Sequence, residues 1–405
     1  MNSIEKNFFT ISFSIFPILL IAGTFLSNFY LTFISVYFFY FCIKKNHIVW
    51  KKNYLVYSFS AFYIYLLLNS IFADDILISL KRTLPYIRFF IFVLFFKILI
   101  ENNFINLKKI LFFWLIILVI ISLDMFYQGI TGYNITGYST GHPLRNSSFF
   151  FDELKVASFF VGFSFLSVSY FLEKKYYYKT LVLLIIFLIA CLISGERSNL
   201  IRYVLIFSFT FFLIIKSINF KKKIFILFIL FIPITGALYL NGDKIYERFF
   251  VDSISYNNEQ DLQSIYKNSR YGAHAMTSLE ILKDNFFIGV GNKNFRKVCK
   301  NYQKKLINDG FINGCSTHPH QTYYEFLSEH GVIGTLIIMS IIFGIIIKKI
   351  KEDNLSMMNL MALMFILNIF IPILPTGSFF TSYSSTIFWM NMLFFLINSK
   401  NKKIL

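Results

Sequence analysis

Long apolar stretches separated by short polar segments dominate the chain. They lie near residues 8–25, 28–43, 54–72, 84–100, 110–127, 154–172, 179–194, 198–216, 223–240, 322–347, 356–374 and 380–398. Most have the roughly 17 to 25 residues that a helix needs to cross a bilayer, and polar flanks can extend the shortest. The pattern predicts an all-α polytopic membrane protein with about twelve transmembrane helices.

One long polar interval interrupts this pattern between the ninth and tenth apolar stretches. Residues 241–319 are polar enough to form a folded loop outside the membrane, with helices expected at 272–284 and 293–307. The chain therefore divides into nine membrane helices in residues 1–240, the loop, and three membrane helices in residues 320–405.

Composition supports the membrane class. Of the 405 residues, 56% are hydrophobic, 20% are aromatic and 15% are charged, which leaves too little polar surface to coat a soluble globule. The mean hydropathy of +0.62 agrees.

Lysine placement sets the expected orientation. With the N-terminus in the cytoplasm, every short inside loop is basic, whereas the outside loops near 23–28, 128–144 and 375–383 contain no Lys or Arg. Both termini are then cytoplasmic, and residues 241–319 form a periplasmic loop. The net charge of +18 comes mostly from these inside lysines, so we expect membrane lipids as neighbours and no nucleic-acid partner.

Three of the six histidines lie in Ser316–Gly334, "STHPHQTYYEFLSEHGVIG", where the tenth apolar stretch begins. Pro319 fits the first helical position, which places His320 in the first helical turn and His318 just before the helix. Free N–H groups and the helix dipole there favour a phosphate and disfavour protonation of His320.

A neutral histidine beside a bound phosphate is a usable general base. Tyr324 shares the helix face of His320, four residues later, and suits a membrane interface. On these residues alone, histidines that simply occupy an interface are an equally good interpretation.

A histidine followed by Asn, Gln or Ser, nine residues and Gly-x-x-Gly is the signature of the O-antigen ligase family. His320, Gln321, Gly331 and Gly334 match it position for position. Three further stretches are similar to that family: "FFFDELKVASFF" (149–160), "GVGNKNF" (289–295) and "CSTHPHQ" (315–321). The resemblance covers roughly residues 140–350 and extends to the related O-antigen polymerases.

This resemblance implies a GT-C-like membrane glycosyltransferase that takes a glycan from undecaprenyl pyrophosphate at the periplasmic face of a bacterial inner membrane. A ligase transfers the glycan to a lipid A core, whereas a polymerase transfers it to another lipid-linked chain. The implied reaction is inverting and needs no metal and no cofactor, because the donor is already activated. The implied catalytic groups are His320 as base and two arginines from external loops.

Arg197 and Arg270 are our candidates for those arginines. Arg197 lies in the short outside turn before the eighth apolar stretch, and Arg270 lies in the large loop. A guanidinium offers the planar, bidentate donors that a pyrophosphate needs. The alternatives are a helix-end charge paired with Glu196 for Arg197, and a solvated loop residue for Arg270.

Further substrate-binding candidates are His318, Tyr324 and three arginines. Arg88 lies near the outer end of the fourth apolar stretch, where a charge is costly and is by default functional or paired. Arg82 just before it and Arg145 in an outside loop are expected to extend a basic lining for the lipid phosphates.

Cys299 and Cys315 share the outside loop and are predicted to form a disulfide that ends five residues before His320. Cys42 and Cys191 lie inside apolar stretches and are predicted to remain thiols. No metal site is expected, because the histidines flank a proline without a partner at the spacing of a helical zinc site.

A transporter, such as a lipid-linked oligosaccharide flippase, is the competing class. About twelve spans, basic inner loops and buried charges also describe a secondary carrier. Titratable groups at one membrane face and the lack of detectable repeat symmetry favour the transferase.

Overall fold

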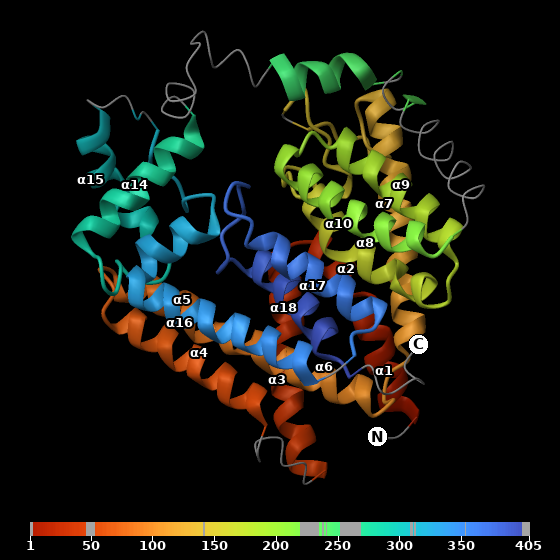
Figure 1. Ribbon diagram of the computed structural model, residues 1–405, viewed down its shortest axis with the longest axis horizontal. Helices are drawn as coiled ribbons and strands as arrows, with labels where there is room; N and C mark the ends of the chain where they lie inside the picture. The colour runs from red at the N-terminus through yellow and green to blue at the C-terminus, as the bar shows by residue number, and fades with distance from the viewer. Residues whose placement is uncertain are drawn as a thin grey trace.

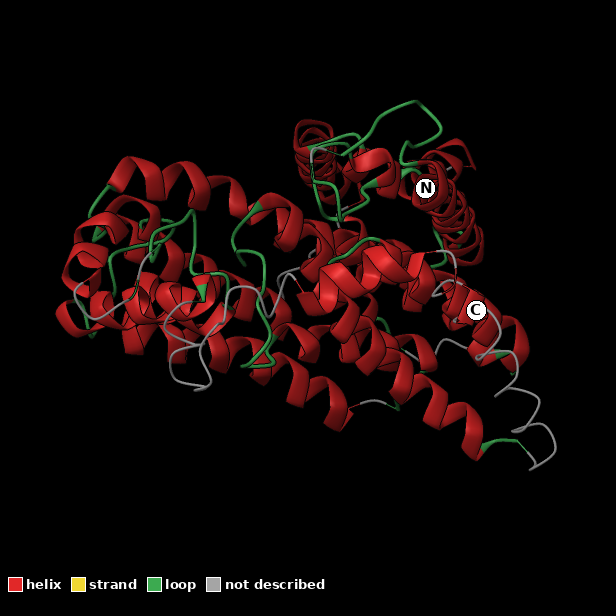
Figure 2. Ribbon diagram, turned by 90° about the horizontal axis from the view of Figure 1, so that it is seen from above, coloured by secondary structure: helices red, strands yellow, loops and turns green. Residues whose placement is uncertain are grey.

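The computed structural model describes residues 3–45, 53–140, 142–218, 235–236, 239, 241–251, 269–307, 311, 313–352 and 354–398. Within these ranges the chain consists of helices, turns and loops, with no strand among them (Figure 2). The all-α prediction is therefore confirmed for the described part of the chain.

The helices fall into an N-terminal and a C-terminal series. The first series comprises α1 (Ser3–Ser14), α2 (Phe16–Ile21), α3 (Thr24–Lys45), α4 (Tyr54–Ile71), α5 (Ile76–Thr83), η1 (Leu84–Tyr86), α6 (Ile87–Glu101), α7 (Leu107–Thr131), η2 (Ser148–Phe150), α8 (Val156–Glu173), α9 (Tyr177–Ile193) and α10 (Arg197–Lys216). The second comprises the π-helical turn η3 (Glu247–Val251), α14 (Arg270–Asp284), α15 (Phe295–Leu306), α16 (Thr322–Glu352), α17 (Met357–Ile369) and α18 (Ser382–Leu396).

Seven helical segments in the described residues are long and apolar enough to cross a membrane. They are α3, α4, the α5–α6 segment, α7, α8, α10 and α16. Helices α9 and α17 are apolar but shorter, and the ninth predicted span at 223–240 lies largely outside the described residues. The number of about twelve spans therefore stays a prediction.

The first apolar stretch differs from its prediction because it forms two helices instead of one. α1 ends at Ser14, and α2 carries Pro17 in its first turn. Proline has no N–H to donate to the preceding turn, which favours a helix end before it.

Helix α18 packs against α6 on one side and against α8 and α17 on the other (Figure 1). Trp389 of α18 is fully buried, and its indole N–H donates to the Tyr86 hydroxyl at 3.0 Å. Aromatic packing of this kind, with the indole N–H satisfied, stabilises the contact between α18 and the η1–α6 segment.

A layer of polar helices covers one end of the bundle. Helices α14 and α15 pack against each other, and both contact α16 (Figure 1). They occupy most of the two segments for which helices were expected within 241–319. Residues 252–268, 308–310 and 312 of that region lie outside the described part of the chain.

The C-terminal ends of α6, α16 and α18 lie close together and are joined by polar contacts. The Asn398 N–H donates to the Glu101 carboxylate at 2.9 Å, and Lys349 Nζ donates to the Ile397 carbonyl at 3.0 Å. Lys97 forms an ion pair with Glu101 at 2.5 Å. This lysine-bearing end includes residues 348–351 in the last turn of α16, which we predict to lie on the cytoplasmic side.

Helix α16 breaks at Gly331, which has φ of 63° and ψ of −170°. The segment 286–291 enters this break and takes over the missing backbone hydrogen bonds. The N–H groups of Val290 and Gly291 donate to the carbonyls of Ser328 and Glu329 at 3.0 and 2.8 Å. On the other side, the N–H of Val332 donates to the Phe286 carbonyl at 2.8 Å.

The close approach requires glycine at two facing positions. A Cβ on Gly331 would lie 2.5 Å from the carbonyl carbon of Phe287, and one on Gly289 would lie 2.5 Å from His330 N. Gly289 also has a positive φ of 67°. Gly331 thus lies at a break in α16 that another segment fills.

We expect Gly289→Ala to lower the free energy of unfolding by about 1–3 kcal/mol, because the new Cβ clashes and the backbone is left-handed. Thermal unfolding in detergent measures this change. Gly344→Ala in α16 is the control, since a Cβ there meets nothing within 4 Å. Equal stability of the two variants would contradict the tight packing at the break.

Candidate functional site

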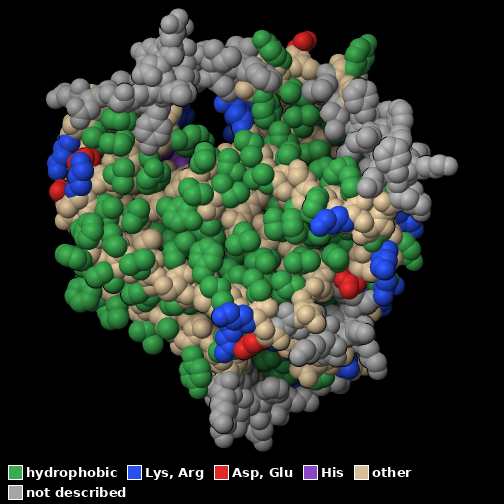
Figure 3. Space-filling view, viewed as in Figure 1, with side chains coloured by type: hydrophobic (Ala, Val, Ile, Leu, Met, Phe, Trp, Pro, Cys, Tyr) green, Lys and Arg blue, Asp and Glu red, His purple; other side chains and the backbone are tan. Residues whose placement is uncertain are grey.

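A cavity of about 460 Å³ lies where the membrane helices meet the polar layer. Its charged and titratable lining includes Arg145, Arg197, Arg202, Arg248, His318 and His320. Figure 3 shows a hollow beside the broad apolar face, with Lys or Arg and His side chains at its opening. The cavity has one wall of histidines and one of arginines.

The histidine wall is the loop that precedes α16. The rings of His318 and His320 lie 4.0 Å apart, and His274 of α14 stacks on His320 at 5.3 Å. His320 Nε2 lies 3.1 Å from the Ser316 hydroxyl. The Thr376 N–H donates to the His320 carbonyl at 2.7 Å, which ties this loop to the segment before α18.

The predicted position of His320 in the first helical turn is wrong. Helix α16 begins at Thr322, and His320 precedes it with a left-handed φ of 59°. The Gln321 side chain accepts the Tyr324 N–H at 3.0 Å, as a helix cap does. A free helix N-terminus therefore does not explain the chemistry of His320.

Burial lowers the pKa of His318 and His320 to about 3 each. Lys293 adds to the effect at His318, and His318 adds to it at His320. Burial also lowers the pKa of His274. The histidines are therefore neutral at physiological pH, with ring nitrogens able to accept a proton.

The arginine wall is built around the turn between α9 and α10. Arg197 is the first residue of α10, and Arg248 Nε donates to the Gly195 carbonyl at 3.1 Å. A Cβ on Gly195 would lie 2.7 Å from the Leu144 carbonyl and 3.2 Å from Arg145 Cγ. The missing side chain at Gly195 thus lets three arginines gather.

Glu196, the residue before Arg197, is held by hydrogen bonds from two other residues. Its buried carboxylate accepts the Ala157 N–H at 2.9 Å and the Asn199 amide at 2.7 Å. Burial raises the pKa of Glu196, and these hydrogen bonds oppose the rise. Burial also lowers the pKa of Arg145, which Glu196 partly offsets.

The loop that carries Arg145 is anchored on α7. Buried Asp124 accepts the Ile135 N–H at 2.7 Å and the Ser148 hydroxyl. Gln128 accepts the Ser147 and Ser148 N–H groups at 3.1 and 2.8 Å. The acid that the sequence places in an apolar stretch thus has a structural role, because it fixes a loop of the cavity.

Arg202 lies deeper in the cavity, one turn further along α10. It is 4% exposed, and Nη2 donates to the Leu374 carbonyl at 3.2 Å. Its Nε has no hydrogen-bond partner in the described part of the chain. Arg202 therefore brings a cation to the apolar side of the cavity instead of reaching outward.

The structure does not bring the other predicted residues to the cavity lining. Arg88 is held by Asn28 at 2.9 Å and Ser382 at 3.2 Å. Arg82 is exposed on α5, and Tyr324 lies outside the lining. Arg82 and Arg88 were predicted from their position near the membrane face, which does not fix the direction of a side chain. Tyr324 was predicted from a helix face shared with His320, but His320 precedes the helix.

Arg270 begins α14 and is exposed, whereas its neighbour Tyr271 lines the cavity. The Tyr271 ring lies 6.0 Å from that of His320. Arg270 is close enough to His274 to help lower the pKa of that histidine, after burial. The structure therefore places Arg270 at the rim of the histidine wall.

Cys299 and Cys315 are joined by a disulfide, with their Cα atoms 5.1 Å apart. The bond links α15 to the loop that carries the histidines. Cys42 and Cys191 are free and buried.

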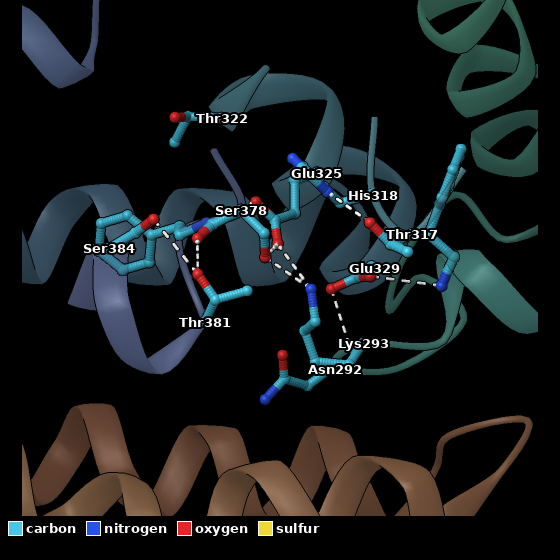
Figure 4. Close-up of polar contacts among 12 residues, drawn as sticks. Asn292, Lys293, Thr317, His318, Thr322, Glu325, Glu329, Ser378, Thr381 and Ser384 are labelled. Atoms are coloured by element: carbon cyan, nitrogen blue, oxygen red, sulfur yellow. Dashed lines mark hydrogen bonds and ion pairs between the residues drawn. The ribbon is translucent and has the colours of Figure 1, made fainter. Parts of the chain in front are cut away.

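A buried polar cluster that was not predicted from the sequence lies behind the histidines (Figure 4). Lys293 Nζ lies 3.5 Å from Glu325 and donates to Ser378 at 2.6 Å. Glu329 accepts the Lys293 N–H at 2.7 Å. All three charged residues are at most 1% exposed. Arg248 and Tyr271 were also missed, because nothing in their sequence neighbourhoods distinguishes them.

Comparison with known proteins agrees with the motifs. Residues 182–339 match the model of the family described as O-antigen ligase. The matched segment includes Arg197, Arg248 and both histidines of the cavity. No curated protein matches the chain.

Acid should destabilise the protein through the two cavity histidines. Their pKa values are about 3 when folded and near 6.5 when unfolded, so the unfolded chain binds more protons between these limits. The free energy of unfolding should therefore fall as the pH drops below 6.5.

Thermal unfolding at pH 7 and pH 5 tests this expectation. The His318→Asn/His320→Asn variant should lose less stability over that interval than the wild type, because Asn does not titrate. Parallel losses in both proteins would contradict the assignment of neutral histidines.

Proposed function

We propose that this chain, assigned to the O-antigen ligase-like superfamily by its family match, transfers a glycan from undecaprenyl pyrophosphate to a lipid A core. The observation that carries the proposal is the single cavity in which neutral histidines face a cluster of arginines. A base on one side and an anion clamp on the other are what transfer from a pyrophosphate donor requires.

In the proposed step, His320 removes the proton from the acceptor hydroxyl as its oxygen attacks the anomeric carbon. The bond between that carbon and the pyrophosphate oxygen breaks, and the electron pair leaves with the lipid pyrophosphate. Attack opposite the leaving group inverts the anomeric centre. Arg145, Arg197 and Arg248 offset the charge that grows on the leaving group, and Arg270 is the rim residue that reaches it.

Apolar residues on the membrane side of the cavity suit a lipid-linked donor. Phe365, Ile369 and Phe388 line this part, close to Arg202. The polyprenyl chain would lie along these residues while the phosphates meet the arginines. Activation by pyrophosphate supplies the leaving group, so we propose a reaction without a metal or cofactor.

The proposed location is the bacterial inner membrane, with both termini in the cytoplasm and the cavity open to the periplasm. The basic inside loops of the sequence support this orientation. The Cys299–Cys315 disulfide beside the site suits an oxidising compartment.

A polymerase and a flippase are the two alternative functions. A polymerase of the same superfamily would use the same cavity with another lipid-linked glycan as acceptor. A flippase would use it only for binding, and does not need a neutral base beside the anion site. Glycolipid gels of a deletion strain separate the ligase from the polymerase: lost caps indicate a ligase, and single-repeat caps indicate a polymerase.

We expect His320→Ala to reduce transfer at least about 100-fold, because general-base catalysis typically contributes that much. Radiolabelled glycan transfer by purified protein measures the rate. His318→Ala should be milder, and unchanged thermal stability is the control for folding. More than a tenth of the wild-type rate in His320→Ala would remove His320 as the base.

Arg145→Lys, Arg197→Lys and Arg270→Lys should each slow transfer, because lysine keeps the charge but loses the planar pair of donors. We expect the two cavity-lining residues, Arg145 and Arg197, to show the larger loss. Arg82→Lys is the matched control, since Arg82 is exposed away from the cavity. Wild-type rates in Arg145→Lys and Arg197→Lys would overturn the clamp.

A further inference from the structure

The buried cluster behind the histidine wall joins two segments that are distant in sequence. Glu329 holds the first segment by accepting the N–H groups of Lys293 and Phe295 at 2.7 and 3.3 Å. Glu325 holds the second by accepting the Phe379 N–H at 2.8 Å and the Ser378 hydroxyl. Both glutamates belong to the first turns of α16.

Lys293 connects the two segments through its side chain. Its Nζ donates to Ser378 at 2.6 Å and pairs with Glu325 at 3.5 Å (Figure 4). The ammonium, the hydroxyl and the carboxylate therefore all contact one another. Ser378 therefore accepts from the lysine and donates to the glutamate. Each polar group is satisfied although Lys293 is 1% exposed and Glu325 is fully buried.

The second segment also holds the histidine loop. The Thr376 N–H donates to the His320 carbonyl at 2.7 Å, and the Thr376 hydroxyl lies 3.2 Å from that of Thr322. Gln321 Nε2 donates to the Pro372 carbonyl at 3.0 Å. The position of His320 thus depends on a segment that the Lys293–Glu325 pair fixes two residues away.

Stability alone does not account for a buried pair at this place. Taking two charges out of water costs several kcal/mol per ion in proteins, and well-packed apolar residues often stabilise equally well. The anchoring of segment 289–295 by Glu329 also uses only backbone N–H groups of Lys293 and Phe295. The ammonium of Lys293 is therefore not needed to anchor segment 289–295, and its contacts are with Ser378 and Glu325.

We propose that Lys293 and Glu325 are positioning residues for the histidine wall: their ion pair fixes segment 372–379, which holds His320, and sets the charge around both cavity histidines. This inference rests on the proposed function for its catalytic meaning only. Its structural part, the position of His320 and the charge around His318 and His320, does not depend on the reaction.

Charged and titratable groups reach the two histidines from several elements. His320 is surrounded by His318, by His274 of α14, by Glu325 of α16 and by Lys293. His318 faces Lys293, His274 and Arg296 of α15. Lys293 opposes a proton on either histidine, whereas Glu325 favours a proton on His320. The two members of the pair therefore act with opposite sign.

The opposite signs give a test that does not require turnover. Diethyl pyrocarbonate modifies neutral imidazole, and mass spectrometry of the peptide containing His318 and His320 follows it in the purified full-length protein. We compare pH 5 with pH 7.5 and use His142 as the internal reference. Wild type should react similarly at both values, because these histidines have pKa values of about 3.

Lys293→Met should lower the pH 5 to pH 7.5 reactivity ratio at least about twofold, because removal of the cation favours protonation. Glu325→Gln should leave the ratio at the wild-type value, and the double variant should lie between the two singles. General structural damage would move both single variants in the same direction. Such a common shift, or an unchanged ratio in Lys293→Met, would overturn the proposal.

A second measurement keeps the test decisive if a charge variant fails to fold. Ser378→Ala leaves both charges and removes the shared hydroxyl, so transfer should show a kcat about tenfold lower with donor KM within about twofold. Ser378→Thr should restore the rate, and Lys97→Met, from an ion pair in α6, is the control. Wild-type kcat in Ser378→Ala would overturn the positioning role.

The two readouts also separate this inference from the proposed function. If wild-type protein shows no transfer to any lipid-linked acceptor, the proposed function fails. The histidine reactivity of Lys293→Met and Glu325→Gln still decides the positioning claim.

Discussion

At Gly331 the backbone of α16 gives up its own hydrogen bonds, and segment 286–291 supplies new partners. A helix cannot simply break near a bilayer, because unsatisfied N–H and C=O groups cost several kcal/mol each in an apolar surrounding. The exchange solves this problem and joins the polar layer to the membrane helix by main-chain bonds. The junction also helps to position the histidine wall, because it fixes the first part of α16, which begins two residues after His320.

The arginine wall is supported independently. Asp124 and Gln128 of α7 hold the loop of Arg145, and Gly195 lets Arg145 and Arg248 approach the start of α10. Neither support touches the break in α16. Helices α8, α17 and α18 pack against one another and line the cavity between the two walls, so their packing sets the distance between the walls.

Long apolar runs and composition were enough to predict the all-α class, because such runs have few other stable structures in a membrane. They did not predict the division of the first run into α1 and α2. The histidine signature also led to the cavity. The direction in which a side chain points was not predictable. Arg88 lies in an apolar run as expected, yet its guanidinium binds Asn28 and Ser382 and does not line the cavity. A sequence does not state which helix will face a given side chain.

Lys293 shows a second limit. A lone lysine in "GVGNKNF" has the appearance of a solvated loop residue, since lysines are rarely buried. Its partners Glu325 and Ser378 are 32 and 85 residues away along the chain, so no local pattern reveals them. Likewise the sequence around Gly331 does not reveal the break in α16, because glycine also occurs within regular helices.

The disulfide between Cys299 and Cys315 makes completion of the histidine wall depend on chemistry outside the chain. While both thiols are reduced, the loop that leads to His320 lacks its covalent tether to α15. Closing it needs an electron acceptor. The protein thus carries a maturation step that distinguishes a newly inserted chain from a finished one.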